Sequence, residues 1–136
     1  MFLLDTNCFI YYFNNSQSEF CEWFESLDNS EIYISSLVIF ELLTGYYTKN
    51  NQKMINVIIQ MTDNYNIVNY DINDAILSAK NKAQLRQRGV QNNSLDIHIA
   101  SQAINNQLTL VTFNNKDFKV IEGVNIKSFV FHNSRT

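Results

Sequence analysis

The stretch MFLLDTNCFIYYF, residues 1–13, carries the pattern that decides the fold class. A short apolar run, Met1–Leu4, ends at Asp5, and a helical pattern follows over Cys8–Phe13. An apolar run bounded by a polar residue is typical of a buried strand, and the pattern after it predicts a strand–helix unit. Such units build α/β folds in which helices cover a parallel sheet.

The same alternation continues along the chain. Further strands are predicted at Ile32–Ser35, Ile67–Tyr70, Leu108–Thr112 and Val124–Phe129. Helices are predicted at about Ser18–Leu27, Leu37–Tyr47, Gln52–Thr62, Asp71 or Asn73 to Arg88, and Leu95–Asn105. We therefore expect an α/β fold with a mostly parallel central sheet of four to five strands flanked by helices. In such sheets, ligands bind outside the carboxyl ends of the strands.

Local signals refine some of these boundaries. Ser36 is the expected cap of the helix over Leu37–Tyr47. Gly89 is expected to end the helix that runs from Asp71 or Asn73 to Arg88. The segment Asn114–Lys116 is expected to form a polar turn after its strand.

Length and composition indicate one globular domain over residues 1–136. The chain is 46% hydrophobic and 17% charged, which excludes a disordered class. Its two cysteines, Cys8 and Cys21, make neither a disulfide framework nor a zinc-ligand pattern. The opening stretch has no basic segment and its apolar run is too short for a signal segment. These features predict a cytoplasmic protein with reduced thiols.

The charge is unevenly distributed along the chain. Residues 1–48 contain seven acids and no Lys or Arg, whereas residues 49–136 contain ten basic residues and six acids. A weakly basic flank beside an acidic pit is compatible with phosphodiester chemistry. Scattered surface charge explains the same numbers equally well, so charge alone leaves both interpretations open.

Four acids fall where the predicted strands end or helices begin. Asp5 follows the first strand, Glu41 lies about one turn into the helix after the second, and Asp96 opens a helix. Asp117 follows the strand over Leu108–Thr112. Clustered carboxylates repel one another unless a cation neutralises them. Oxygen ligands suit Mg2+ or Mn2+ rather than zinc, and such ions support phosphodiester hydrolysis.

Each acid also has a purely structural explanation. Asp5 could cap the helix after it, and Asp96 is favourable at a helix N-terminus without any function. Glu41 could be a surface residue, although its apolar neighbours suggest a partly enclosed position, and Asp117 could be a turn residue. His98 is expected to be a satisfied polar residue rather than a ligand. The arrangement of the four acids therefore carries the prediction.

Four blocks in order resemble the PIN-domain family, and most closely its VapC toxins of toxin–antitoxin pairs. The blocks are MFLLDTNCFIYYF, ISSLVIFELLTGYY, AKNKAQLRQRGVQNNSLDIHIASQAI and LTLVTFNNKDFKVIEGVNI, and they cover nearly the whole chain. The resemblance implies a PIN-like domain and activity as a metal-dependent endoribonuclease. It implies Mg2+ as cofactor, with Mn2+ as a possible substitute.

The resemblance also implies roles for particular residues. Asp5, Glu41 and Asp96 would be the catalytic, metal-binding acids. Asn114 and Asp117 are both candidates for completing the metal site, with Asp117 the catalytic acid of the two. Supporting residues are implied at three positions: Thr6 and Asn7 would hold the Asp5 turn, and Thr112 would supply a hydroxyl behind the acids.

The implied substrate is RNA, expected to be structured RNA such as transfer RNA. The basic residues on the helix before Asp96 would contact its backbone, or else form an exposed solubilising face: Lys80, Lys82, Arg86 and Arg88. The resemblance further implies a homodimer and a cognate antitoxin that covers the site. Some aromatic side chains could form the antitoxin groove, although core packing explains most of them: Phe9, Tyr11, Tyr12, Phe13, Phe20, Trp23 and Phe24.

Three other function classes are weighed against the nuclease. A phosphatase using Asp5 as nucleophile wants a second Asp two residues on, where Asn7 stands. A receiver-type signalling domain needs an acid pair after the first strand, and only Asp5 is present there. The remaining alternative is a catalytically inactive PIN-like module that binds RNA or a protein.

Overall fold

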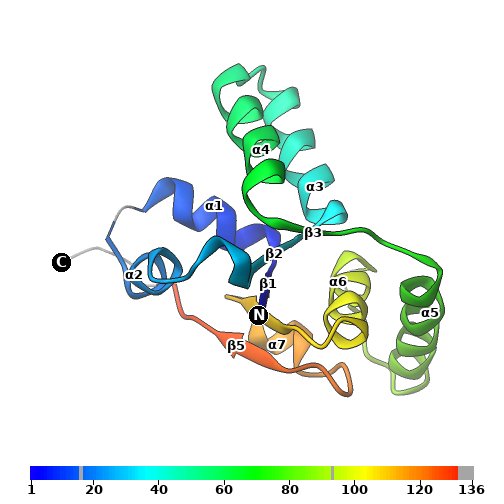
Figure 1. Ribbon diagram of the computed structural model, residues 1–136. Coiled ribbons are helices and arrows are strands. Elements are labelled where there is room, and N and C mark those ends of the chain that lie inside the picture. Colours follow the sequence, from blue (N-terminus) through cyan, green and yellow to red (C-terminus); the bar gives the residue numbers. More distant parts are fainter. Residues whose placement is uncertain (16, 93, 132–136) are drawn as a thin grey trace.

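The computed structural model describes residues 1–15, 17–92 and 94–131, and it contains one five-stranded sheet (Figure 1). The strands are β1 (Phe2–Leu4), β2 (Ile32–Ser35), β3 (Asn66–Val68), β4 (Thr109–Thr112) and β5 (Ile126–Ser128). Their order is β3-β2-β1-β4-β5, and every neighbouring pair is parallel. The predicted α/β fold class is confirmed, with the sheet wholly parallel.

Helices cover both faces of this sheet. They are α1 (Thr6–Asn14), α2 (Glu19–Glu25), α3 (Ser36–Thr48), α4 (Gln52–Asn64), α5 (Ile72–Gln87), α6 (Ser94–Asn105), α7 (Asn115–Phe118) and a 3-10 helix at Asn29–Glu31. Right-handed crossovers place α1–α4 on one face and α5–α7 on the other. Packing agrees, because α3 contacts α1 and α4 while α6 contacts α5 and α7. Among the described residues, no helix has the length and apolar character to cross a bilayer.

The central strand β1 explains why the opening stretch decides the fold. Leu3 and Leu4 are completely buried, because both faces of β1 are covered. The chain leaves β1 for α1 on one face and leaves the neighbouring β4 for α7 on the other. Such a reversal opens a crevice at the carboxyl ends of the two strands. Asp5 and Thr112 stand at these ends.

Capping explains the helix boundaries that the sequence left open. Ser35, rather than the expected Ser36, caps α3, since its hydroxyl accepts a hydrogen bond from the Leu37 N–H at 3.0 Å. Asp71 caps α5 and forms a reciprocal capping box with Asp74. The expected polar turn after β4 is wrong, because that segment forms the short helix α7.

Aromatic side chains fill the core on the α1–α2 side of the sheet. Phe9, Phe20 and Phe24 are buried, and Tyr11 is nearly so. The Phe20 ring lies 5.1 Å from the ring of Phe129, measured between centroids. Core packing is therefore the confirmed explanation for these four, while the side chains of Tyr12, Phe13 and Trp23 are half-buried.

Candidate metal centre

Asp5 is the most buried of the four acids and is held by fixed partners. One carboxylate oxygen, Oδ1, accepts from the Cys8 N–H at 3.3 Å, and Oδ2 accepts from the Thr112 hydroxyl at 2.6 Å. Burial raises the pKa of Asp5, and these hydrogen bonds oppose that shift only in part. Asp5 therefore caps α1, as the structural explanation proposed, and also faces the crevice between β1 and β4.

Asp96 lies in the first turn of α6 and responds to the other three acids. Its pKa is raised to about 6, first by burial and then by the charges of Asp5, Asp117 and Glu41. The partial positive charge of a helix N-terminus acts in the opposite direction and lowers the pKa of an acid. Burial and the neighbouring carboxylates favour the protonated form of Asp96 instead. Four separate segments thus bring negative charge to one place.

Three of these acids line one small pocket of about 40 Å³. Asp5 directly follows β1, while Glu41 and Asp96 lie on α3 and α6, and the remaining lining residues are Thr6, Asn7, Leu95 and Ile99. The side chain of Glu41 is exposed by surface area, yet it lines this pocket, which agrees with the partly enclosed position expected for it. Of its apolar neighbours in the sequence, Leu42 is buried and Phe40 is 66% exposed.

Asn114 and Asp117 form a connected pair beside Asp5. The Thr112 hydroxyl, which donates to Asp5, accepts from the Asn114 N–H at 2.8 Å. The Asn114 amide nitrogen then donates to Asp117 Oδ2 at 2.6 Å, and Asn92 donates to the Asp117 carbonyl at 2.7 Å. Asn114 therefore orients Asp117, and Asp117 is the member of the pair whose charge reaches Asp96.

Thr6 and Asn7 also line the acid pocket. The Thr6 hydroxyl is buried and has no hydrogen-bond partner within the described part of the chain. A buried hydroxyl without a partner costs free energy, and this one is enclosed by the protein rather than open to the pocket.

The donor set fits a hard divalent ion that keeps part of its water shell. Within residues 1–15, 17–92 and 94–131, no three Asp, Glu, His or Cys side chains converge on one metal position. Mg2+ is commonly held by one or two carboxylates and several waters, so it does not need such convergence. Repulsion between ionised carboxylates also favours separated side chains when no cation lies between them.

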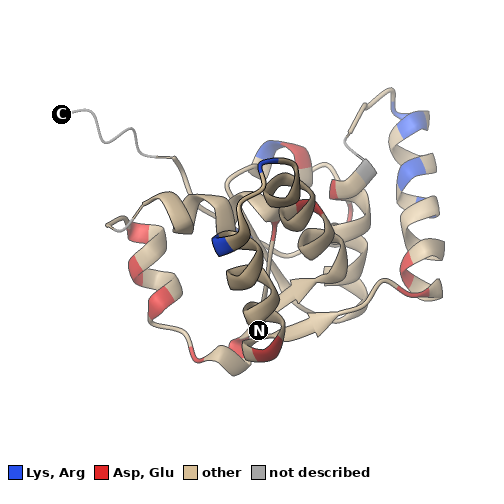
Figure 2. Ribbon diagram, turned by 90° about the horizontal axis from the view of Figure 1, so that it is seen from above, with Lys and Arg blue, Asp and Glu red and all other residues tan. Residues whose placement is uncertain are grey.

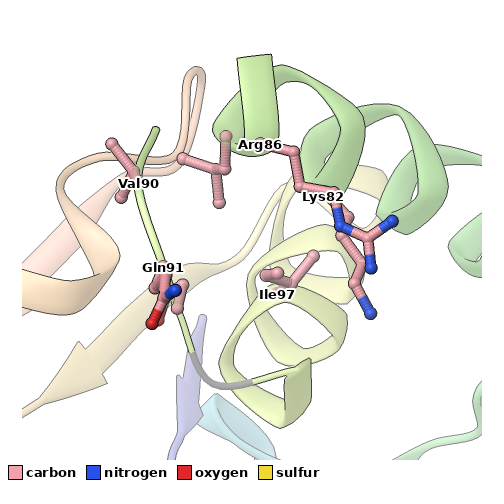
Figure 3. Close-up of a pocket in the computed structure, with 7 residues that line it drawn as sticks. Lys82, Arg86, Val90, Gln91 and Ile97 are labelled. Atoms are coloured by element: carbon pink, nitrogen blue, oxygen red, sulfur yellow. The ribbon is translucent and has the colours of Figure 1, made fainter. Parts of the chain in front are cut away.

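The structure separates the four predicted RNA-binding cations. Lys82 and Arg86 line a pocket of about 360 Å³ beside α6, together with Leu85, Val90, Gln91, Asn92 and Ile97 (Figure 3). Arg88 instead donates to the Val120 carbonyl at 3.0 Å, and Lys80 lies at a different hollow with Ile76 and Asn105.

Two further lysines lie near the acids and were not among the predicted RNA-binding residues. Lys116 and Lys119 line a pocket of about 330 Å³ with Asp117, on the other side of Val90–Asn92 from Arg86. The available signal was their position on either side of Asp117 in the sequence.

His98 has a hydrogen-bond partner, as expected, because its Nδ1 lies 2.6 Å from the Tyr70 hydroxyl.

A larger groove continues from the acid pocket between α1 and the α3–α4 pair. It has a volume of about 510 Å³ and shares Thr6, Asn7 and Glu41 with the acid pocket. Its other walls are largely apolar or aromatic and include Ile10, Phe13, Leu42, Tyr46 and Met54.

A parallel sheet with acids at its switch point defines the class of protein, and the family match agrees with it. Residues 2–124 match the PIN domain family, and the chain belongs to that family. Within the family, the chain is of the VapC type, as its relatives and structural neighbours indicate.

Two curated relatives match almost end to end. The chain is 29% identical over 129 residues to the tRNA(fMet)-specific endonuclease VapC of Salmonella typhimurium, covering 94% of this chain and 97% of that protein. It is 28% identical over 134 residues to ribonuclease VapC2 of Rickettsia felis, covering 95% and 98%.

Solved structures of VapBC complexes contain chains with the same overall fold. The DNA-bound VapBC of Salmonella typhimurium matches with a TM-score of 0.84 at 29% identity, covering 93% of this chain and 96% of that one. VapBC2 of Rickettsia felis bound to a promoter DNA fragment matches with a TM-score of 0.83 at 27% identity, covering 94% and 98%.

Proposed function

We propose that the protein is a Mg2+-dependent endoribonuclease toxin that hydrolyses phosphodiester bonds in structured RNA such as transfer RNA. The observation that carries the proposal is the pocket that Asp5, Glu41 and Asp96 line together, with the charge of Asp117 close enough to raise the pKa of Asp96. Relatives named as VapC ribonucleases support the same reaction. Such a function belongs in the cytoplasm, where its RNA substrate is found.

Asp5, Glu41 and Asp96 are the proposed ligands of Mg2+ or Mn2+. Asp117 completes the acid set, and Asn114 orients it through the 2.6 Å hydrogen bond. When bound, the ion would polarise a phosphoryl oxygen and assist attack by water. Thr112 keeps Asp5 turned toward the crevice through its donated hydrogen bond.

Two pairs of cations would hold the RNA backbone beside these acids. Lys82 and Arg86 lie on one side of the segment Val90–Asn92, and Lys116 and Lys119 lie on the other. Contacts with phosphate fix the position of a nucleic acid without reading its sequence. We therefore assign positioning of the scissile phosphate to both pairs, and we expect Lys80 and Arg88 to contribute less.

The experiment that tests this function is cleavage of purified transfer RNA with Mg2+, with Mn2+ and with EDTA. We expect cleavage that EDTA abolishes and that either ion restores. Undiminished cleavage in EDTA would contradict the proposed dependence on a divalent metal ion. Binding of RNA without cleavage under any of these conditions would favour the alternative, an inactive PIN-like binding module.

We also propose that a cognate antitoxin occupies the groove between α1 and α3–α4. The groove offers apolar walls for hydrophobic side chains and opens into the acid pocket, which would attract a basic side chain. The VapBC neighbours support this partner. A Tyr46→Lys variant should weaken antitoxin binding more than an exposed control, Gln60→Lys on α4, in a calorimetric titration.

A homodimer through the outer face of α5 completes the proposal. This helix buries Asp74, Ser78 and Asn81 but leaves Ile72 and Ile76 exposed by 72% and 63%. The exposed apolar positions of α5 follow a three-and-four spacing typical of helix pairing: Ile72, Ile76, Ala79 and Ala83.

Two antiparallel copies of this helix would be self-complementary. Each Ile72 would face the Ala83 of a second copy, and each Ile76 would face an Ala79, so that large side chains meet small ones. Figure 2 shows acids at one end of α5 and basic residues toward the other, so this pairing also matches opposite charges. Light scattering should report a dimer for the wild type and a monomer for Ile76→Lys, whereas Gln52→Lys on α4 should remain dimeric.

A further inference from the structure

A fully buried polar pair joins two helices that carry proposed metal ligands. Ser35, the last residue of β2, and Gln102 on α6 are both 0% exposed. The Ser35 hydroxyl donates to Gln102 Oε1 at 2.6 Å across 67 residues of sequence. Neither side chain has a role in the function proposed above.

The direction of each hydrogen bond in this pair is fixed by its partners. Gln102 Nε2 donates to the Val68 carbonyl at 3.3 Å, and a carbonyl can only accept. Gln102 therefore presents its oxygen to Ser35, whose single proton goes to that oxygen. The Ser35 oxygen is then free to accept from the Leu37 N–H at 3.0 Å. The chain of bonds runs from the start of α3 through β2 and α6 to β3.

Few direct contacts join α3 to α6 in the described part of the chain. The main contacts of α3 are with α1, α4 and β2, whereas those of α6 are with α5, α7 and β4. Figure 1 shows the α3–α4 pair extending away from the sheet, apart from the α5–α6 pair. Packing against α1 and the geometry at the base of α3 therefore both set the direction of this helix, and the Ser35–Gln102 hydrogen bond lies at that base.

The two ligands are equally distant in sequence from this hydrogen bond. Glu41 lies six residues after Ser35, and Asp96 lies six residues before Gln102. Six residues span about 9 Å along a helix axis. A change of angle at the base of α3 is therefore carried to Glu41, while Asp96 stays with the sheet and α5.

Packing alone does not require polar side chains at these positions. An unbranched apolar side chain such as Met has a volume close to that of Gln and needs no hydrogen-bond partners. Burying polar groups costs free energy that apolar packing avoids, and the hydrogen bonds offset this cost while imposing a defined geometry.

We propose that the Ser35–Gln102 hydrogen bond is a positioning contact that sets the Glu41 carboxylate relative to Asp96. This inference rests on the proposed metal-dependent function. Gln102 and Ser35 touch no substrate; they act through the direction of α3 and thereby tune the affinity for the divalent ion.

The test compares Gln102→Met with two controls on the same strand as Ser35. Ile32 is buried at the other end of β2. The variants Ile32→Val and Ile32→Ala are a mild and a stronger destabilisation, so that one of them matches the loss of melting temperature of Gln102→Met. We expect Gln102→Met to weaken Mn2+ binding by about 3-fold, less than the loss of a partner bonded directly to a metal ligand. Hydrogen exchange should also become faster in Ser36–Thr48 for this variant, and neither effect should appear in an Ile32 control of equal stability.

Two further variants keep the test decisive if Gln102→Met folds poorly. Ser35→Ala removes the hydroxyl and should reproduce both effects, and Ser35→Thr retains a hydroxyl and should restore wild-type values. Unchanged exchange in Ser36–Thr48 for Gln102→Met and Ser35→Ala would overturn the proposal. Exchange requires no metal, so it decides this inference even if wild-type protein neither binds Mn2+ nor cleaves RNA, a result that would instead refute the proposed function.

Discussion

Asp5 and Glu41 line the same pocket in opposite environments. Asp5 is buried at the end of the central strand, and the Thr112 hydroxyl and the Cys8 N–H hold its two oxygens. Glu41 is exposed on a helix that extends away from the sheet. The site therefore has a fixed side built on β1 and β4 and an adjustable side built on α3. Removing a group should cost most where the geometry is preformed.

The largest effect is expected for Asp5→Asn. Loss of this charge removes a proposed ligand that is already oriented, so kcat/KM for RNA cleavage should fall by on the order of 10³-fold, equivalent to about 4 kcal/mol. The measurement is initial rates with saturating Mg2+, and RNA binding measured separately should persist. A variant that cleaves at more than a tenth of the wild-type rate would exclude Asp5 as a ligand.

Thr112→Val tests the support of the fixed side. The variant keeps the shape of the side chain but removes the hydrogen bonds to Asp5 Oδ2 and from the Asn114 N–H. Metal affinity should fall by about 10-fold to 100-fold, as it does when partners of metal ligands are removed. Thr109→Val, at the far end of the same strand, is the matched control, and equal effects of the two variants would contradict the prediction.

Glu41→Gln tests the adjustable side. Because its side chain is exposed and less constrained than that of Asp5, we expect a loss of about 10-fold in kcat/KM, smaller than that of Asp5→Asn. The measurement is the same cleavage assay, with Thr44→Ser on the exposed surface of α3 as control. A loss as large as that of Asp5→Asn would contradict the proposed difference and would indicate that Glu41 is held as firmly as Asp5.

The smallest effect concerns the stability of the metal-free protein. Asp96 has a raised pKa of about 6 against 3.8 in its unfolded reference, so the folded state binds more protons between these values. The free energy of unfolding should therefore rise as the pH falls from 7 through 6, by about 1 kcal/mol after allowance for solvent screening at this half-exposed group.

Urea titrations of wild type and Asp96→Asn between pH 7.5 and 5 measure this difference. The raised pKa of Asp5 acts in the same direction, so the variant should have a flatter pH dependence but not a flat one. Saturating Mg2+ should stabilise wild type more at pH 7.5 than at pH 5.5, since it compensates ionised carboxylates. Identical slopes for the two proteins would contradict the shift assigned to Asp96.

The strands β1 and β2 were predictable because they are short, mostly apolar runs that are largely buried. The bounds of β2 agree with the prediction residue by residue, since the polar residues that follow Ile32–Ile34 are also the cap of α3. The helix α7 was not predictable, because four residues cannot show a helical period and the segment has the composition of a turn.

For the candidate site, sequence position predicted which acids gather but not how each is held. Asp5, Glu41 and Asp96 do line one pocket, because the carboxyl ends of parallel strands meet at one edge of the sheet. The exposure of Glu41 depends on the direction of α3, and the Ser35–Gln102 pair depends on a contact across 67 residues. Neither leaves a periodic signal in the sequence.

The sequence by itself determined the parallel α/β sheet and the family, because apolar runs, caps and strand-end acids are local patterns. Only the tertiary structure decided that the Asp5 carboxylate is fixed while that of Glu41 is adjustable. It also decided that Asn114 donates a hydrogen bond to Asp117, and that α5 buries polar residues while it exposes two isoleucines. These properties depend on which side chains meet across distant segments, and burial and charge interactions exist only once those segments are in contact.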